Sequence, residues 1–232
     1  MGMRIRKQLQ RRNGPHGQVT SMLGFSMVEM LVVVAIALII SGFAVLNTQG
    51  AMRDSRVNGA YDTAFMQLRL ARERSIAERK RYIVTFGTPA PTGALTPLGA
   101  PTAKSIQVYR WDAGNPSPAP VEVSTIDLPI DVAFQALAGL PTTTAKVPDG
   151  FGNGTTPIDF DQGVGAGGGN LVMFMPDGSA HDLLGNSNSG VLYIARNADL
   201  SSSRALTVFG TSGRIRGWRL TQPGGLATWK QQ

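Results

Sequence analysis

The longest apolar stretch of the chain lies near its N-terminus. Residues 30–46 carry no charge and consist mostly of Val, Ile, Leu and Ala. A helix running over residues 25–46 would be about 33 Å long, roughly the thickness of the hydrocarbon core of a bilayer. The pattern therefore predicts a transmembrane or filament-core helix over residues 25–47.

After residue 47 the pattern becomes amphipathic. Apolar residues recur at steps of three and four positions, which is the period of a helix with one buried face. We expect the helix to continue over residues 48–81, with weak points near residues 47–50 and 58–59, where Asn and Gly occur. The predicted buried stripe consists of Val57, Tyr61, Ala64, Phe65, Leu68 and Ala71.

Beyond residue 81, short β-rich segments alternate with stretches of Gly, Pro, Thr and Asn. Such segments favour strands, whereas the Pro-rich stretches at 87–103 and 113–120 and most of residues 139–170 favour loops. The expected strands cover residues 82–86, 105–111, 121–130, 131–134, 171–175, 190–196, 205–209 and 214–220, with a further short strand at 158–160. This order predicts one α+β protein with its strand-rich domain over residues 82–232.

The charged residues of the N-terminal region are unevenly distributed along the chain. Residues 1–24 contain five basic residues and no acidic ones, so this leader is expected to stay cytoplasmic. Glu29 then lies at the start of the apolar helix, where an unpaired carboxylate in lipid would cost about 2.5 kcal/mol or more. Cleavage after Gly24 would create a free amine on Phe25, and that cation is a suitable partner for Glu29.

The segment Gly24-Phe25-Ser26-Met27-Val28-Glu29, placed between a basic leader and an apolar helix, resembles the type IV prepilin signal. The resemblance implies cleavage between Gly24 and Phe25 by a prepilin peptidase and N-methylation of Phe25. It also implies a filament in which Glu29 neutralises the Phe25 amine of a neighbouring subunit. The alternative is a plain signal anchor with no role in assembly.

The last third of the chain resembles the GspH/FimT family of minor pseudopilins and minor pilins. The similarity lies in a strand, the turn Pro176-Asp177-Gly178, further strands, and a closing hairpin with Ser-Gly-Arg-Ile-Arg at 212–216. It implies a pilin-like α+β fold, in which a long N-terminal helix packs on an antiparallel β-sheet domain. Residues 87–170 show no such resemblance, and their role stays open.

What the resemblance implies is a non-enzymatic subunit of a type II secretion pseudopilus or a type IV pilus-like filament, which it enters or primes. Before assembly the subunit would cross the inner membrane once, with its C-terminal domain in the periplasm. The implied partners are the prepilin peptidase, other pilins or pseudopilins, and an inner-membrane assembly platform.

A second function, DNA binding in an uptake pilus, is suggested by the C-terminal charge. Residues 82–203 contain four basic and ten acidic residues, whereas residues 204–232 contain five basic and no acidic ones. Alternation along a strand would place Arg214, Arg216 and Trp218 on one face, exposed if Ile215 points into the core. Guanidinium groups bind phosphates and an indole can stack on bases, and Gly-Arg-x-Arg resembles a motif associated with DNA capture. Alternatively, these arginines are solvated or contact a neighbouring subunit.

The remaining signals for a binding or catalytic site in the sequence are weak. The glycine-rich residues 163–169 lack the Lys and Ser/Thr of a phosphate loop. Asp159 and Asp161 are two carboxylates that could hold a cation such as calcium, without the rest of a ligand loop. His181 is expected at the surface. The chain has no cysteine, and we predict no disulfide, metal site, cofactor or catalytic residue.

Overall fold

The computed structural model describes residues 25–87, 104–111, 120–162 and 169–232, without the side chains of residues 44–49, 161 and 162. Contacts divide the chain into two units, Met1–Asn47 and Thr48–Gln232. Among the described residues, no helix combines the length and the apolar character that crossing a membrane requires. The predicted membrane segment at residues 25–47 stays a prediction.

Helix α1 spans Met27–Glu78 and begins with a side-chain cap. The hydroxyl of Ser26 accepts a hydrogen bond from the backbone N–H of Glu29 at 3.2 Å, and the negative charge of Glu29 lies in the first turn. Ser followed three residues later by Glu is the capping-box sequence, and the acid also complements the helix dipole. In the first unit, every large apolar side chain from Phe25 to Phe43 is more than half exposed.

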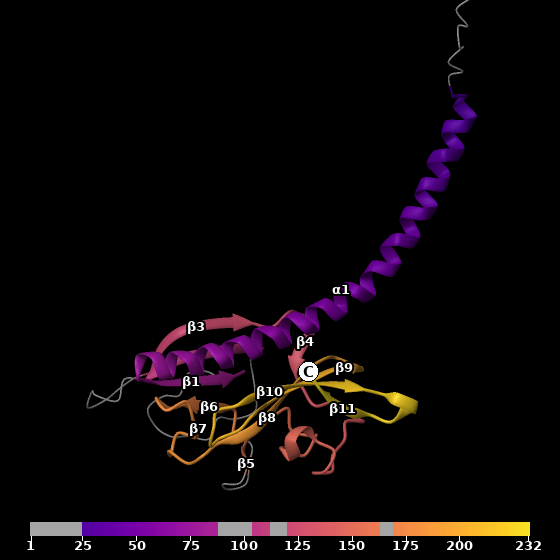
Figure 1. Ribbon diagram of the computed structural model, residues 1–232. Helices are drawn as coiled ribbons and strands as arrows, with labels where there is room; N and C mark the ends of the chain where they lie inside the picture. The colour runs from indigo at the N-terminus through magenta and orange to yellow at the C-terminus, as the bar shows by residue number, and fades with distance from the viewer. Residues whose placement is uncertain (1–24, 88–103, 112–119, 163–168) are drawn as a thin grey trace, which may run out of the picture. The chain divides into compact units, whose positions relative to one another are not determined.

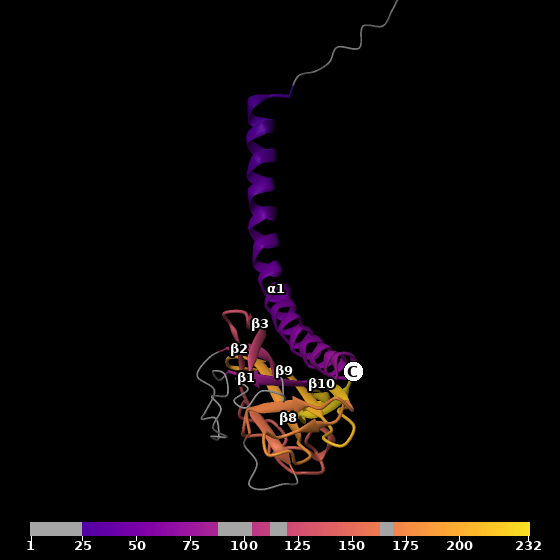
Figure 2. The same cartoon turned by 90° about the vertical axis from the view of Figure 1, so that its left-hand side faces the viewer.

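The second unit contains two antiparallel sheets (Figures 1 and 2). Sheet 1 has the strand order β3-β2-β1-β6-β7, with β1 Arg81–Phe86, β2 Ser105–Trp111, β3 Val121–Asp127, β6 Leu171–Phe174 and β7 Ala180–His181. Sheet 2 has the order β11-β10-β9-β8-β4, with β4 Val132–Phe134, β8 Ser189–Arg196, β9 Asp199–Val208, β10 Ile215–Thr221 and β11 Thr228–Gln231. Strand β5 (Ile158–Gln162) pairs with β8, and the 3₁₀ turns η1 and η2 cover Pro148–Gly150 and Pro223–Gly225.

One core joins α1 to both sheets. The predicted stripe of the helix is buried, with Val57, Ala64 and Leu68 fully enclosed and Phe65 packed at the edge. Alternate residues of β1, β2 and β6 from sheet 1, and of β8 and β9 from sheet 2, complete this core. The helix therefore holds the two sheets together.

Two smaller apolar clusters lie on the other faces of the sheets. Residues 136–151 cover the outer face of sheet 2, where the rings of Tyr193 and Trp229 pack at a tilt of 40° with their centroids 5.7 Å apart. On the outer face of sheet 1, Ile83, Tyr109 and Met173 pack together. Apolar side chains therefore pack on both faces of the sheets, since successive residues of a strand point to opposite faces.

Polar contacts also tie α1 to the sheets. The buried guanidinium of Arg204 in β9 donates from Nη2 to Asn58 Oδ1 at 2.9 Å and from Nη1 to the Ser202 carbonyl at 3.0 Å. Burial lowers the pKa of this guanidinium. Arg72 donates from Nε to the Gly178 carbonyl at 3.1 Å and from Nη2 to the Ser212 carbonyl at 3.1 Å.

The α+β class and the antiparallel pairing are confirmed, with corrections in detail. Two sheets are present where one was expected. The helix runs unbroken through residues 47–50 and 58–59, and Asn58 is used to bind Arg204. It ends at Glu78 instead of residue 81, because Arg79 adopts a positive φ of 54° and β1 begins at Arg81. The predicted strand over residues 121–130 ends at Asp127, before Pro129.

The sequence prediction missed β7 and β11 and the first part of β9. The residues Ser201, Ser202 and Ser203 in β9 and the short segment Thr228–Gln231 carry little alternating hydrophobicity. Their pairing with stronger neighbouring strands decides their conformation.

Replacing Gly217 with Ala is expected to destabilise the second unit. A Cβ at Gly217 would lie 1.6 Å from Tyr61 Oη and 2.8 Å from Cζ, and overpacking of this kind costs about 1–3 kcal/mol. Denaturant unfolding of Gly217→Ala should show this loss, and adding Tyr61→Phe should recover part of it.

Gly59→Ala is the matched control, because nothing lies within 4 Å of a Cβ there and the residue is in α1. It should stabilise the protein by about 1 kcal/mol. Equal destabilisation by both glycine substitutions would contradict the proposed contact between Tyr61 and β10.

Candidate functional site

The predicted basic hairpin lies in sheet 2, where β10 pairs with β9 and β11. Ile215 packs against the core shared with α1, which is the condition under which the opposite face of β10 would be exposed. Arg216 and Trp218 stand opposite Thr207 and Ala205 of β9 in the pairing register. The environments of the three predicted residues differ, however.

Arg216 is held by an ion pair within the protein. Its Nη1 donates to Oδ1 of Asp149 in η1, and this carboxylate side chain is only 6% exposed. The Arg216 guanidinium also lies 5.0 Å from the centroid of the Phe209 ring, and Phe209 in turn meets Phe151 edge to face. Arg216 therefore anchors the loop that covers the outer face of sheet 2.

Trp218 belongs to the same network. Its indole N–H donates to Thr207 Oγ1 at 3.2 Å, and the Thr207 hydroxyl donates to Asp149 Oδ2 at 2.5 Å. The indole is partly buried against the outer cluster of sheet 2. Arg214, by contrast, is exposed. Of the three residues predicted to contact DNA, Arg214 is the one that presents its side chain to solvent.

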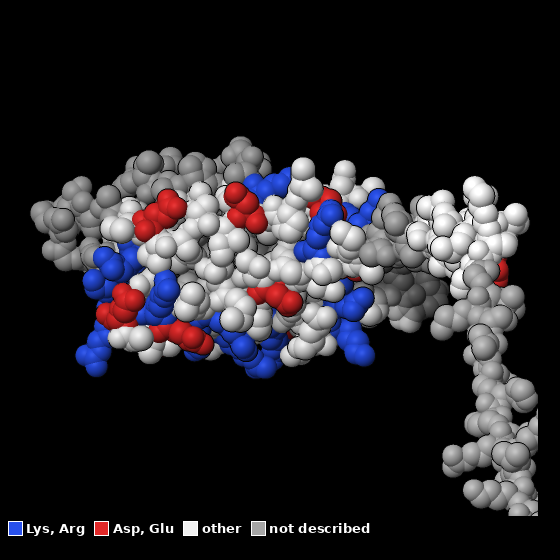
Figure 3. Space-filling model, turned by 90° about the horizontal axis from the view of Figure 1, so that it is seen from above, with Lys and Arg blue, Asp and Glu red and all other residues white. Residues whose placement is uncertain are grey.

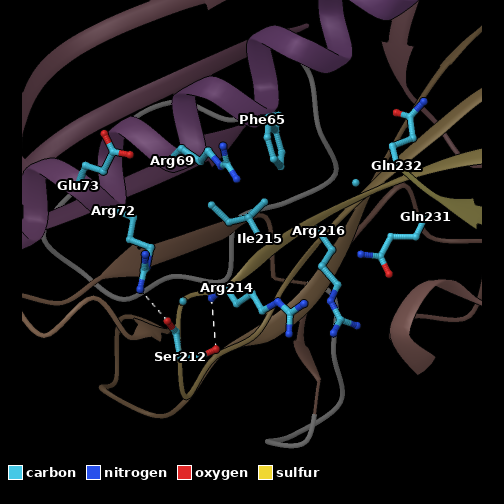
Figure 4. Close-up of a pocket in the computed structure, with 12 residues that line it drawn as sticks. Phe65, Arg69, Arg72, Glu73, Ser212, Arg214, Ile215, Arg216, Gln231 and Gln232 are labelled. Atoms are coloured by element: carbon cyan, nitrogen blue, oxygen red, sulfur yellow. Dashed lines mark hydrogen bonds between the residues drawn. The ribbon is translucent and has the colours of Figure 1, made fainter.

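A groove lies between the C-terminal half of α1 and the β10 hairpin, and we call it the α1–β10 groove (Figure 4). Its volume is about 870 Å³. Four arginines and one glutamate line it, so its charge is positive. The lining residues are Phe65, Arg69, Arg72, Glu73, Ser212, Gly213, Arg214, Ile215, Arg216, Gly217, Gln231 and Gln232.

Two of the four arginines in this groove are exposed, Arg69 from the helix and Arg214 from the hairpin. The guanidinium of Arg69 lies 4.4 Å from the centroid of the Phe65 ring, in cation–π contact. Arg72 and Arg216 are engaged with protein acceptors. The sequence analysis missed Arg69, although its position four residues after Phe65 places the two on one side of a helix.

The charge on the face that carries α1 and β3 is mixed. Figure 3 shows Lys and Arg side chains on several parts of this face, with Asp and Glu side chains among them. A positive groove bordered by acids favours a ligand that enters it over one that lies flat on the whole face.

The turn after β6 contains a hydrogen-bonded group of Asp177, Ser179 and His181. The Ser179 hydroxyl donates to Asp177 Oδ1 at 2.5 Å and contacts His181 Nε2 at 2.8 Å, while His181 Nδ1 lies 2.8 Å from the Gly185 carbonyl oxygen. Hydrogen bonds from Ser179 lower the pKa of the Asp177 carboxyl. In a catalytic triad the acid contacts the imidazole instead of the hydroxyl. Here the contacts fix the turn.

The remaining predicted sites are only partly described. Phe25 and Glu29 are exposed at the start of α1, and Gly24 lies outside the described residues. Asp159 in β5 is buried, while the side chain of Asp161 and residues 163–168 lie outside the description. Within the described part of the chain, no group of three or more His, Cys, Asp or Glu residues could hold a metal ion.

No family model and no curated protein matches the chain. Among solved structures, the chain is similar to the type IV minor pilin FimU of Pseudomonas aeruginosa, with 11% sequence identity and a TM-score of 0.37. The match covers 72% of this chain and 89% of the FimU chain. This likeness is too weak to decide the family or the function of this chain.

Arg216→Ala is expected to destabilise the second unit by about 3 kcal/mol, because it leaves the buried Asp149 carboxylate without its cation. Arg214→Ala, two positions away on an exposed side chain, should change the free energy of unfolding by no more than about 0.5 kcal/mol. Urea unfolding of both variants checks this. Equal stability of the two variants would contradict an anchoring role for Arg216.

Proposed function

We propose that the protein is a minor pseudopilin or minor pilin of the GspH/FimT type, which enters or primes a type II secretion pseudopilus or a type IV pilus-like filament. The main observation behind this proposal is that the two parts of α1 differ in the exposure of their apolar side chains. Its first part exposes a continuous set of large apolar side chains, while its second part buries one stripe in a folded domain.

An exposed apolar helix of this kind requires a cover. The thirteen large apolar side chains exposed from Phe25 to Phe43 surround the helix instead of forming one stripe. Lipid satisfies such a surface before assembly, and neighbouring helices of the same kind satisfy it in a filament. A single globular partner with one binding groove would cover only one side.

The sequence supports the remaining steps of the proposal. A prepilin peptidase cleaves between Gly24 and Phe25, Phe25 is N-methylated, and the domain after residue 47 faces the periplasm while residues 25–47 cross the inner membrane. Glu29 of an incoming subunit then pairs with the Phe25 amine of its neighbour, which relieves the desolvation of both charges.

Two substitutions at Glu29 separate its charge from the size and polarity of its side chain. Both keep the cap, because the Ser26 hydroxyl accepts from the backbone N–H of residue 29. Glu29→Ala removes the whole carboxylate group, whereas Glu29→Gln keeps a polar side chain of similar size without the charge. We expect both variants to be processed normally, as the mass of the mature chain will show, and both to be lost from sheared filaments by at least about tenfold, because an uncompensated amine remains buried.

Glu29→Asp, which keeps the charge, should retain part of the assembly. Normal filament incorporation of Glu29→Gln would contradict the pairing of charges between Glu29 and the Phe25 amine. A full-length chain, uncut at Gly24, would contradict the prepilin assignment itself.

The α1–β10 groove favours a second candidate function, DNA binding in an uptake pilus. Arg69 and Arg214 are exposed cations on its two walls, Ile215 lies between them, and Phe65 lies beside Arg69 on α1 (Figure 4). Exposed guanidinium groups can bind phosphates without breaking internal contacts. Arg216 and Trp218, which the sequence also suggested, already have partners in the protein.

A salt titration of DNA binding by residues 48–232 tests this candidate function, because it should distinguish arginines that contact DNA phosphates from those that do not. Affinity should fall steeply with salt, and Arg69→Ala and Arg214→Ala should each weaken binding and reduce the slope of log K against log salt by about 1. Arg219→Ala, an exposed arginine of β10 outside the groove, is the matched control. No binding near physiological salt, or equal loss in the control, would exclude the groove as a DNA site.

A further inference from the structure

A second hollow, of about 750 Å³, lies at the end of the folded unit where α1 enters it. Four basic residues and one acidic residue line it, together with the isolated apolar residue Ile130. We call this surface the Ile130 face. Its lining residues include Arg53, Arg56, Lys104, Ile130, Asp131 and Arg196.

Ile130 is the most exposed large apolar side chain among the described residues, at 88%. It lies in the turn between β3 and β4, which a hydrogen bond from Val132 N to the Pro129 carbonyl closes at 3.0 Å. Lys104 Nζ donates to the carbonyl of Ile130 at 3.1 Å. The turn is therefore fixed by its backbone, while the side chain points away from the core.

Among the described residues that line this hollow, the single acid is already paired, so the lining carries a net positive charge. Asp131 accepts from Arg56 at 3.3 Å, and Asp199 is ion-paired with Arg196. Arg53 and Lys104 are exposed, and the hydrogen bond that Lys104 Nζ makes with Ile130 is to a neutral carbonyl oxygen.

The position in the chain indicates what this face meets. Arg53 is the first charged residue after Glu29. At 1.5 Å per residue, Arg56 lies about 14 Å along the helix from Asn47, where the predicted membrane segment ends. Cations directly beyond a membrane segment lie within reach of lipid headgroups.

We propose that the Ile130 face docks on a membrane surface that contains anionic phospholipids. Arg53 and Lys104 bind headgroup phosphates, and Ile130 enters the apolar boundary beneath them. An apolar side chain among cations is the combination that binds interfacial helices and peripheral proteins to membranes. The inference rests on the proposed membrane anchoring of residues 25–47. It implies that the folded unit contacts the membrane surface before the subunit enters a filament.

Vesicle binding by residues 48–232 tests the docking without the apolar helix. All buried apolar residues of the core lie between Val57 and Trp229, so this fragment keeps the whole core. It should bind vesicles of phosphatidylcholine mixed with phosphatidylglycerol and not vesicles of phosphatidylcholine alone. Arg53→Gln and Lys104→Gln should each weaken binding about fivefold, and Ile130→Ser about tenfold.

Arg219→Gln, an exposed arginine of β10 outside both hollows, is the control and should bind as the unaltered fragment does. Equal binding to both kinds of vesicle, an equal loss in the control, or self-association of the fragment through this face without lipid binding would each overturn the proposal. The fragment lacks Phe25 and Glu29, so these results are separate from the processing and assembly of the full chain.

The full-length protein provides an independent measurement. Because the chain has no cysteine, Ile130→Cys can carry a single environment-sensitive fluorophore in reconstituted vesicles. Its emission should shift to the blue only when anionic lipid is present. Leu226→Cys, 74% exposed in the β10–β11 hairpin, should show no shift. The same emission at both positions would contradict docking through Ile130.

Discussion

The folded unit depends on the burial of one stripe of α1 between two sheets. Val57, Ala64 and Leu68 are fully enclosed, and the strands on both sides of them contribute to the same core. Because neither sheet closes into a barrel with the other, each needs the helix to cover its inner face. The first part of the same helix has no such cover in the isolated chain, and this contrast within one element leads to the proposed role in a filament.

Local patterns explain which features the sequence could predict. The stripe from Val57 to Ala71 and strands such as β2 and β6 follow from the periodicity of apolar residues, and each was placed nearly as the structure has it. The tie between Arg216 and Asp149 joins residues 67 positions apart through a loop without regular structure. No period in the sequence signals such a contact, so an arginine that anchors a loop looked like one free to bind DNA.

The same limitation applies to the groove and to the Ile130 face. Alternation along a strand is a local property, so the sequence placed Ile215 on the face opposite Arg214 and Arg216, but it left open which of the two faces points inward. The apposition of Arg69 and Arg214, or of Arg53 and Lys104, depends on how distant elements pack. By contrast, the cap that Ser26 provides to the backbone N–H of Glu29 can be recognised from four consecutive residues. The Glu29 carboxylate lies in the same first turn, where it complements the helix dipole beside its proposed role in assembly.

The ties between α1 and the sheets have a mechanical consequence. Asn58 binds Arg204, Tyr61 fits over Gly217, and Arg72 binds the Gly178 and Ser212 carbonyls, so the contacts follow one another along the helix. A pull along the helix axis would load all of them at once, in shear, instead of peeling them apart in turn. A force applied to α1 would therefore be transmitted to the whole folded unit without separating the helix from the sheets.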